Sequence, residues 1–440
     1  MEHKRYTYTP PVEFPEYLSL IYPGKFPNRE DVKTITFQVT ENCCLNCSYC
    51  YQVHNTVNEL DFEKVRPWLE DLFNDKISYI NTSNTKGIVW EFIGGEPFLK
   101  IELMTQITDL IFDLMIQKHH PWLYSSKIGI SSNGILYFDP KVQNYLNKYG
   151  VFIDLSISLD GNKELHDKCR VDLQGNGSYD RVIAAVRHFK QHYGHMPGIK
   201  MTFAPENLDY LNESYQYLIF EGYQELHGNC VYEDVWSLDD ATKLYYQLKQ
   251  LADYILDNDL NKDVFVSFFD EKGFCPVPPT DNENWCGGVH DTMFAIDNNG
   301  LLYHCIRFMD SSLQGDQKSL PIGDIKTGLG VTDEHKENLF NFKQVTRRSQ
   351  STDECFYCPI AQGCGWCSGY NYQVTGSVDK RVTFICPMHK ARSLANVYFW
   401  NKLYKKENID KIFPRYLSDE EGLKIISQSE IDLLNSLERR

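Results

Sequence analysis

Three closely spaced cysteines constrain this chain more than any other feature of its sequence. Cys43, Cys47 and Cys50 follow a C-x3-C-x2-C pattern. Thiolates at this spacing can hold three irons of a cubane iron–sulfur cluster and leave the fourth iron without a protein ligand. An open coordination position is typical of a catalytic metal site, whereas structural sites are closed. A zinc site and buried free thiols are the alternatives, but after Cys50 no cysteine that could complete a zinc site follows before Cys169.

Length and composition indicate a sizeable globular protein. A chain of 440 residues, 42% of them hydrophobic, can bury a large core and suggests two domains or more. No apolar run approaches the ~18 residues that span a bilayer, and the first residues lack the apolar segment of a signal peptide. The chain is therefore expected not to associate with a membrane. Fourteen cysteines without a secretory signal predict metal ligation in a reducing cytoplasm. The net charge of −16 argues against nucleic acid as a partner.

Short β-rich runs alternate with longer helical segments, which is the pattern of parallel βα units. The candidate strands cover residues 34–40, 87–93, 127–132, 151–158, 199–204 and 226–232. Apolar spacing predicts a helix over residues 101–118, and Ser178 is the expected N-cap of another helix. The sequence thus predicts an α/β fold, a partial (β/α)6 TIM-like barrel open at one side. Chemistry in such barrels gathers at the carboxyl ends of strands, where Cys43 is expected.

The cysteine run resembles the signature of the radical S-adenosylmethionine (SAM) enzymes. In that family the open iron of a 4Fe–4S cluster chelates the amino and carboxylate groups of SAM. One electron then cleaves SAM to methionine and a 5′-deoxyadenosyl radical, which abstracts hydrogen from the substrate. The resemblance implies that Cys43, Cys47 and Cys50 are the catalytic cluster ligands, that Tyr49 lies near the adenine, and that Cys44 is no ligand. A register that starts at Cys44 is the alternative.

Segments after the second and third predicted strands resemble the SAM-binding segments of the same family. Gly94-Gly95-Glu96-Pro97 matches its GGE motif, where glycines let the backbone approach a ligand closely. The resemblance implies that Glu96 accepts hydrogen bonds from the SAM ammonium group. Ser132 and Asn133 resemble the segment that contacts the carboxylate and ribose of SAM.

The segment after the fourth predicted strand is less specific. Ser158 and Asp160 lie where the family contacts its cofactor, although Asp160 could equally cap the next helix. Arg170 could pair with the SAM carboxylate or hold a loop, and a surface salt bridge is an equally good interpretation.

Seven further cysteines form an ordered array beyond residues 256–285, a proline-containing stretch predicted to be a linker. They are Cys286, Cys305, Cys355, Cys358, Cys364, Cys367 and Cys386. Their order resembles the SPASM domain, an extension with two auxiliary 4Fe–4S clusters, which would give three clusters in all. The last C-x2-C spacing is one residue shorter than is usual there. Zinc is the alternative, because paired C-x2-C knuckles also bind zinc.

The resemblance divides these thiols between two clusters. The outer cluster would take Cys355, Cys358, Cys364 and Cys386. The inner cluster would take Cys286, Cys305 and Cys367, while Thr292 occupies the position of its usual fourth ligand. Cys275, His290 and Asp291 are candidate replacements, and an open iron that binds a substrate thiolate is the preferred interpretation.

The expected organisation runs from an N-terminal arm to a helical tail. The proposed segments are an arm at 1–33, the radical SAM partial barrel at 34–255, the linker at 256–285, the SPASM domain at 286–395 and the tail at 396–440. The arm is too short for the fused leader-recognition domain of many peptide maturases. A separate leader-binding protein is therefore an expected partner, beside the precursor peptide and an electron donor such as flavodoxin or ferredoxin.

The resemblance implies a peptide or protein maturase. Sulfatase-maturing relatives carry an Asp after the cysteine of a Gly-x4-Cys motif, but here Ile306 and Arg307 follow Cys305. This difference favours thioether crosslinking of a ribosomally made peptide. Carbon–carbon crosslinking, anaerobic sulfatase maturation, a small-molecule radical SAM enzyme and a non-catalytic zinc scaffold are the alternatives.

Overall fold

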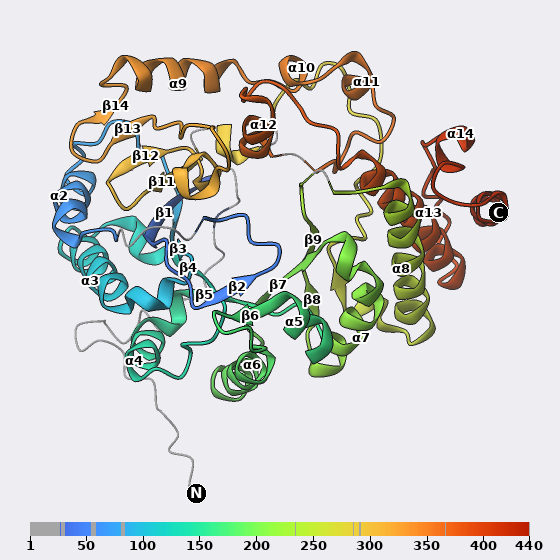
Figure 1. Cartoon of the computed structure of the whole chain (residues 1–440), viewed down its shortest axis with the longest axis horizontal. Helices are drawn as coiled ribbons and strands as arrows, with labels where there is room; N and C mark the ends of the chain where they lie inside the picture. Colours follow the sequence, from blue (N-terminus) through green and yellow to red (C-terminus); the bar gives the residue numbers. More distant parts are fainter. Residues whose placement is uncertain are drawn as a thin grey trace, which may run out of the picture. The chain divides into compact units, whose positions relative to one another are not determined.

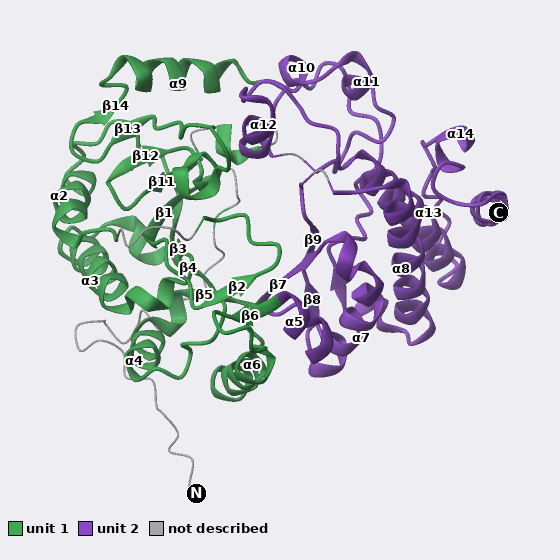
Figure 2. Cartoon of the chain, in the orientation of Figure 1, with its two compact units in different colours: residues 1–158, 170–198, 286–345 green, residues 159–169, 199–285, 346–440 purple. Residues whose placement is uncertain are grey.

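The computed structural model in Figure 1 describes residues 27, 31–53, 59–80, 84–233, 235–284, 286–289, 292–365 and 367–439. The chain divides into two compact units (Figure 2). Unit 1 comprises Met1–Ser158, Arg170–Gly198 and Cys286–Val345, and unit 2 comprises Leu159–Cys169, Ile199–Trp285 and Thr346–Arg440. Among the described residues, no helix has both the length and the apolar character needed to cross a bilayer. Most of the expected N-terminal arm lies outside the described residues.

Unit 1 is built on a large, mostly parallel sheet with the strand order β14-β13-β12-β11-β1-β3-β4-β5. Its strands are β1 (Val32–Thr40), β3 (Gly87–Gly94), β4 (Ser126–Ser132), β5 (Ile153–Ser158), β11 (Met293–Ile296), β12 (Leu301–Tyr303), β13 (Gly323–Asp324) and β14 (Gly328–Leu329). Strands β11, β1, β3, β4 and β5 run parallel, whereas β12, β13 and β14 are added antiparallel. The predicted α/β class with a parallel sheet is confirmed.

Strand β1 is the centre of this sheet. Ile35, Phe37 and Val39 are fully buried on one face, and Thr36 and Gln38 are buried on the other. A strand covered on both faces is characteristic of a parallel sheet flanked by helices. The cysteine-bearing loop therefore leaves from a strand that is buried on both faces.

Helices cover this sheet and connect its strands (Figure 1). They are α2 (Phe62–Leu72), α3 (Ile101–Gln117), α4 (Pro140–Tyr149), α6 (Tyr179–Tyr193) and α9 (Asp333–Gln344), with short 3-10 helices that include η2 (Pro97–Lys100), η4 (Gly150–Phe152), η7 (Gly287–Val289), η8 (Ile306–Phe308) and η9 (Asp310–Ser312). Helix α3 confirms the predicted helix over 101–118, and it buries an apolar stripe at helical spacing. The first residues of the predicted strand 151–158 belong to η4 instead.

Ser178 precedes α6, as predicted, but its side chain does not serve as the expected cap. Its hydroxyl donates a hydrogen bond to the backbone oxygen of Arg170 at 2.7 Å, and no side-chain capping bond is formed. The carbonyl group of the short strand β6 (Arg170–Asp172) competes for this hydroxyl. Ser178 therefore anchors β6 beside the candidate site.

Unit 2 combines two short parallel strand pairs with helices. Strand β7 (Gly198–Phe203) pairs with β9 (Gly228–Cys230), and β8 (Glu225–Leu226) pairs with β10 (Phe265–Val266). The helices are α5 (Lys163–Cys169), α7 (Leu211–Glu221), α8 (Leu238–Asp257), α10 (Arg347–Gln350), α11 (Asp353–Phe356), α12 (Ser368–Thr375), α13 (Cys386–Lys406), α14 (Asp419–Gly422) and α15 (Gln428–Glu438). The single strand predicted over 226–232 is two short strands interrupted at His227.

The segment 256–285 packs against α13 within unit 2. Phe269 stacks on Phe399 with ring centroids 4.2 Å apart. Buried Asn396 donates to the carbonyl of Phe268 at 2.9 Å and accepts from the backbone N–H of Asp270 at 2.8 Å. The stretch with linker composition thus supplies aromatic side chains to the core of unit 2.

Candidate active site

The cysteine loop follows β1 directly and is closed by a short ladder. Strand β2 (Leu45–Cys47) pairs antiparallel with β6, so Cys47 lies opposite Arg170. The backbone N–H of Cys50 donates to the carbonyl of Cys47 at 3.1 Å. Cys43 and Cys47 are half-buried and Cys50 is exposed. The loop therefore presents all the predicted cluster cysteines at the carboxyl end of β1.

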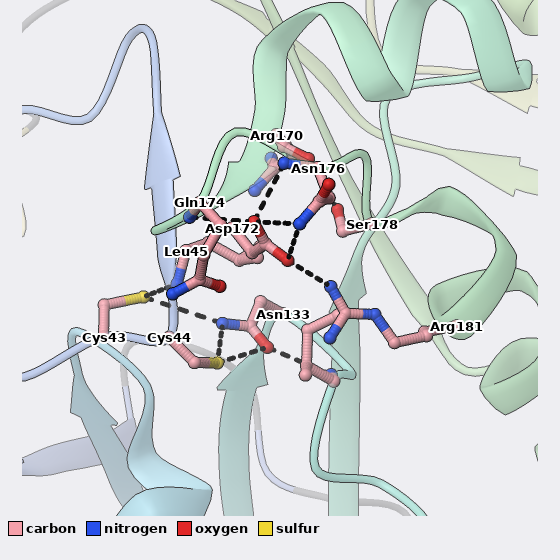
Figure 3. A network of polar contacts seen from close by, with 11 residues as sticks. Cys43, Cys44, Leu45, Asn133, Arg170, Asp172, Gln174, Asn176, Ser178 and Arg181 are labelled. Atoms are coloured by element: carbon pink, nitrogen blue, oxygen red, sulfur yellow. Dashed lines mark hydrogen bonds and ion pairs between the residues drawn. The ribbon is translucent and has the colours of Figure 1, made fainter.

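Asn133 connects the end of β4 to the first cysteines (Figure 3). Its side-chain amide donates to the sulfurs of Cys44 at 3.3 Å and Cys43 at 3.6 Å. The backbone N–H of Leu45 donates to the Cys43 sulfur at 3.4 Å. The hydrogen bond between the thiols raises the pKa of Cys43 and lowers that of Cys44, and the amide of Asn133 further lowers the pKa of Cys44. Hydrogen-bond donors of Asn133 and Leu45 thus face the first sulfurs of the loop.

The glycines of the Gly94-Gly95-Glu96 run allow two backbone segments to touch. A Cβ at Gly94 would lie 2.3 Å from the carbonyl oxygen of Thr40, and one at Gly95 would lie 2.3 Å from that of Asn42. The N–H of Gly95 donates to the Thr40 oxygen at 3.1 Å, and the N–H of Glu96 donates to the Asn42 oxygen at 2.9 Å. The close approach that requires glycine is thus made to the start of the cysteine loop.

Glu96 joins the ends of β3 and β4 through its buried carboxylate. It accepts from the Ser132 hydroxyl at 2.8 Å, from the Asn133 backbone N–H at 2.7 Å and from the Phe98 backbone N–H at 3.1 Å. Burial raises its pKa to about 7, and these donors oppose the shift. Pro97 begins η2, for which Glu96 is the N-cap. The contact between Glu96 and the SAM ammonium group stays a prediction.

Arg170 lies against the cysteine loop. Its guanidinium carbon lies 5.2 Å from the ring centroid of Tyr49, and its Nη1 lies 4.0 Å from the sulfur of Cys47. In the next turn Asp172 accepts from Asn176 and pairs with Arg181 at 3.5 Å (Figure 3). The buried guanidinium thus lies against the cysteine loop, as the loop-holding interpretation expects, and the pairing of Arg170 with the SAM carboxylate stays a prediction.

Ser158 and Asp160 belong to different units. Ser158 is the last residue of β5 in unit 1. Asp160 is fully buried in unit 2, where it accepts a hydrogen bond from the backbone N–H of Thr202 at 3.1 Å. At the start of the next helix, α5, it is the side chain of Asn162 that accepts from a backbone N–H, that of Leu165. SAM contacts by Ser158 and Asp160 stay predictions.

A second loop of unit 1 reaches the cysteine loop, a contact that no sequence pattern indicates. The guanidinium carbon of Arg307 lies 3.7 Å from the ring centroid of Tyr51, the residue after Cys50. The backbone N–H of Val53 donates to the carbonyl of Ser311 at 2.8 Å. In the sequence, this stretch is marked only by Cys305 and by the absence of a carboxylate after it.

The later cysteines are distributed between the units. In unit 1, Cys286 and Cys305 lie around Gly288, where an added Cβ would be 3.6 Å from either sulfur. In unit 2, Cys367 is the N-cap of α12, and its sulfur accepts from the N–H of Tyr370 at 3.4 Å. The backbone oxygen of Cys275, also in unit 2, accepts from the N–H of Gln362 at 3.0 Å. The candidates His290 and Asp291 lie outside the described residues.

The predicted outer-cluster thiols share one electrostatic neighbourhood in unit 2. Burial raises the pKa values of Cys358, Cys364 and Cys386, and neighbouring thiols, Cys355 included, add to each shift. Arg381 counteracts them, with its Nη2 at 2.7 Å from the Cys364 sulfur. Within the part of the chain that the structure describes, no three Cys, His, Asp or Glu side chains meet as a metal site.

The residues of the cysteine loop nevertheless fit an iron–sulfur cluster. Their sulfurs lie on one loop, one of them is exposed, and N–H groups of Leu45 and Asn133 point at sulfur. Such hydrogen bonds stabilise thiolate charge and tune iron–sulfur sites.

Comparison with known proteins identifies the class. Residues 37–218 match the model of the Radical SAM superfamily. Together with the fold and the cysteine loop, this match identifies a radical SAM domain over residues 37–218 and confirms the resemblance drawn from the sequence. The family implies a 4Fe–4S cluster and SAM.

Two relatives and two solved structures illustrate the similarity. An uncharacterized protein of Methanocaldococcus jannaschii is 28% identical over 200 residues, which are 45% of this chain and 62% of that protein. The serine-type anaerobic sulfatase-maturating enzyme of Bacteroides thetaiotaomicron is 23% identical over 375 residues, 78% of this chain and 84% of the relative. Native anSMEcpe with bound AdoMet and Kp18Cys peptide superposes with a TM-score of 0.61 at 19% identity, over 86% of this chain and 99% of the other. Streptococcus suis SuiB bound to precursor peptide SuiA gives a TM-score of 0.51 at 15% identity, over 80% and 75%. Both structures share the fold of this chain.

The contact at Gly95 predicts a large effect from a small substitution. In Gly95→Ala the new methyl group would meet the Asn42 carbonyl, so we expect a loss of roughly 1–3 kcal/mol in unfolding free energy and poorer iron incorporation. Gly129→Ala in β4 is the control, because there the nearest atom is a Val89 methyl at 3.4 Å. Anaerobic urea unfolding and iron analysis check this. Wild-type values for both variants would contradict the packing argument.

The raised pKa of Glu96 predicts a pH dependence with a definite sign. Between the ordinary value of 4.5 and about 7, the folded protein keeps a proton that the unfolded chain has lost. This group therefore makes the free energy of unfolding fall as pH rises through that window. Glu96→Gln should lose this slope, so its stability relative to wild type rises with pH. Urea unfolding across the window tests it, with exposed Glu102→Gln as control, and parallel wild-type and Glu96→Gln curves would refute it.

Proposed function

We propose that this enzyme is a peptide maturase that cleaves SAM and forms a thioether crosslink in a ribosomally made peptide. The observation that carries the proposal is the cysteine loop, held at the carboxyl end of β1 by the backbone contact with Gly94 and Gly95. When bound, a cluster on this loop supplies the electron that turns SAM into a hydrogen-abstracting radical. Cys43, Cys47 and Cys50 are the proposed ligands.

The surrounding residues are proposed to hold this loop and the cofactor. Asn133 and the N–H of Leu45 would stabilise the thiolates, and Arg170 would fix the loop through Tyr49. Cys44 has no proposed ligand role, because the radical SAM signature that this run resembles starts at Cys43. The Gly94-Gly95-Glu96-Pro97, Ser132, Ser158 and Asp160 positions are the proposed SAM contacts.

Auxiliary clusters are proposed on the C-terminal cysteines. In unit 2 the mutual influence of Cys355, Cys358, Cys364 and Cys386 supports one such group. In unit 1 the approach of Cys286 and Cys305 around Gly288 supports a second. Flavodoxin or ferredoxin would supply electrons, and a separate protein would bind the leader.

The peptide substrate is supported by what the relatives' names state. SuiB is described with a precursor peptide, and anSMEcpe with a Kp18Cys peptide. Oxidation of a Cys or Ser side chain to an aldehyde, as in sulfatase maturation, is the second candidate, because sulfatase-maturating enzymes are among the relatives. Ile306 disfavours it, because it follows Cys305 where those relatives carry an Asp and has no carboxylate to act as a base.

Removing the cysteine loop's thiols should separate the proposed clusters. In the Cys43→Ala, Cys47→Ala, Cys50→Ala triple variant we expect no 5′-deoxyadenosine and a fall from roughly twelve irons per chain to roughly eight. Chromatography of the nucleoside products and iron analysis after anaerobic reconstitution measure this. Cys44→Ala is the control and should keep its activity. Robust SAM cleavage by the triple variant would refute the assignment, and zinc in the remaining sites would refute the auxiliary clusters.

The mass of the product separates the candidate reactions. Thioether formation removes one hydrogen from a peptide carbon and one from a cysteine thiol, so the peptide should lose two hydrogens and one reactive thiol. Mass spectrometry with thiol alkylation, applied to short cysteine-containing peptides encoded beside the gene, checks this. Loss of two hydrogens with every thiol still alkylated would indicate carbon–carbon crosslinking, and an aldehyde would indicate formylglycine chemistry.

A further inference from the structure

The loop that contains η8 and η9 is fixed against the cysteine loop within unit 1. The carbonyl of Ser311 accepts from the N–H of Val53 at 2.8 Å. The hydroxyl of Ser311 accepts from the buried amide of Gln38 in β1 at 2.6 Å. These bonds tie the loop both to the central strand and to the residues after Cys50, so η8 has a defined position beside the candidate active site.

Arg307, in the middle of η8, stacks on an aromatic ring of the cysteine loop. Its guanidinium lies over the ring of Tyr51, with its central carbon 3.7 Å from the ring centroid, and the side chain is half-buried. Stacking of this kind occupies the flat face of the guanidinium and leaves its N–H donors, which lie in its plane, directed sideways. Among the described residues, no carboxylate forms an ion pair with Arg307.

In the described ranges, Arg307 has no carboxylate partner although acidic residues are abundant in this chain. The sequence contains 60 Asp and Glu residues against 44 Lys and Arg. Arg66, Arg181, Arg348 and Arg415 each pair with a carboxylate. Arg170 differs again, since it is buried against Cys47 and Tyr49. Arg307 is thus a positioned cation, accessible in part, stacked on the residue that follows the third cysteine of the loop.

We propose that Arg307 binds a carboxylate of the peptide substrate, an Asp or Glu side chain close to the residue that is modified. The planar guanidinium can hold a carboxylate with parallel hydrogen bonds, and its stacking on Tyr51 fixes the direction from which the carboxylate approaches. The inference rests on the proposed peptide substrate and deepens it, because it assigns an acidic residue to the recognised sequence. The carboxylate of SAM has the same chemistry, so the experiment separates the sources.

The probe is a library of short random peptides that each contain one cysteine. Wild type, Arg307→Gln, Arg307→Lys and Arg307→Glu are each incubated with the library and SAM under reducing, anaerobic conditions. Peptides with a SAM-dependent mass change are sequenced. Arg66→Gln is the control, since Arg66 is an exposed arginine of α2 in the same unit that pairs only with the neighbouring Glu63. Iron content and thermal unfolding confirm that each variant is folded.

We expect wild type and Arg66→Gln to enrich Asp and Glu near the modified residue. Arg307→Gln should lose this enrichment, and its KM for an acidic peptide should rise about ten- to hundredfold with a smaller change in kcat, as loss of a charge-assisted hydrogen bond implies. Arg307→Lys should keep part of the preference, and Arg307→Glu should enrich Lys and Arg. A purely structural role for Arg307 would not reverse the charge preference.

The opposite outcomes are equally definite. Equal enrichment of acidic residues by wild type and Arg307→Gln would overturn the inference, and so would modified peptides without any acidic preference. A larger rise in the KM for SAM, measured without peptide, than in the KM for the acidic peptide would assign the carboxylate to SAM and also overturn it. SAM cleavage by all variants without any modified peptide would instead refute the proposed function, and the inference with it.

Discussion

The candidate site depends on one contact between backbones, the approach of Gly94 and Gly95 to the carbonyl groups of Thr40 and Asn42. With any larger residue the new side-chain carbon would lie 2.3 Å from a carbonyl oxygen, well inside van der Waals contact. Hydrogen bonds from Gly95 and Glu96 to the same carbonyls then bind the end of β3 to the first residues of the cysteine loop. The cysteine loop is thereby held by backbone atoms, which no side-chain motion can displace.

A chain of polar contacts connects the end of β3 to the cysteine sulfurs. Glu96 is buried and accepts three hydrogen bonds, two of which come from Ser132 and Asn133 at the end of β4. Asn133 is therefore fixed through its backbone while its side-chain amide reaches the sulfurs of Cys43 and Cys44. A buried carboxylate is costly unless it is hydrogen-bonded, so this network stabilises a unique position for the thiolates. The same burial raises the pKa of Glu96.

Arginines hold the other side of the loop. The tyrosines that flank Cys50 each stack with one, Tyr49 with Arg170 and Tyr51 with Arg307. Because the chain is acidic, these cations offset negative charge that would otherwise build up around the cysteine thiolates. Arg170 is buried and serves the loop, whereas Arg307 is partly accessible and can serve a ligand. Under the proposed function, this asymmetry would assign Arg170 to the cluster-bearing loop and Arg307 to the substrate.

The sequence by itself determined where the strands at 34–40, 87–93 and 127–132 lie, the helix over 101–118 and the cysteine loop at a strand end, because hydrophobic period and motif spacing are local properties of the chain. Only the tertiary structure decided which atoms these residues meet. Ser178 bonds the Arg170 carbonyl instead of capping its helix, and Gln38 finds Ser311 across 273 positions. Arg307 likewise reaches Tyr51 from a distant loop. Such partners depend on close packing between segments far apart in sequence, and no local pattern records that packing.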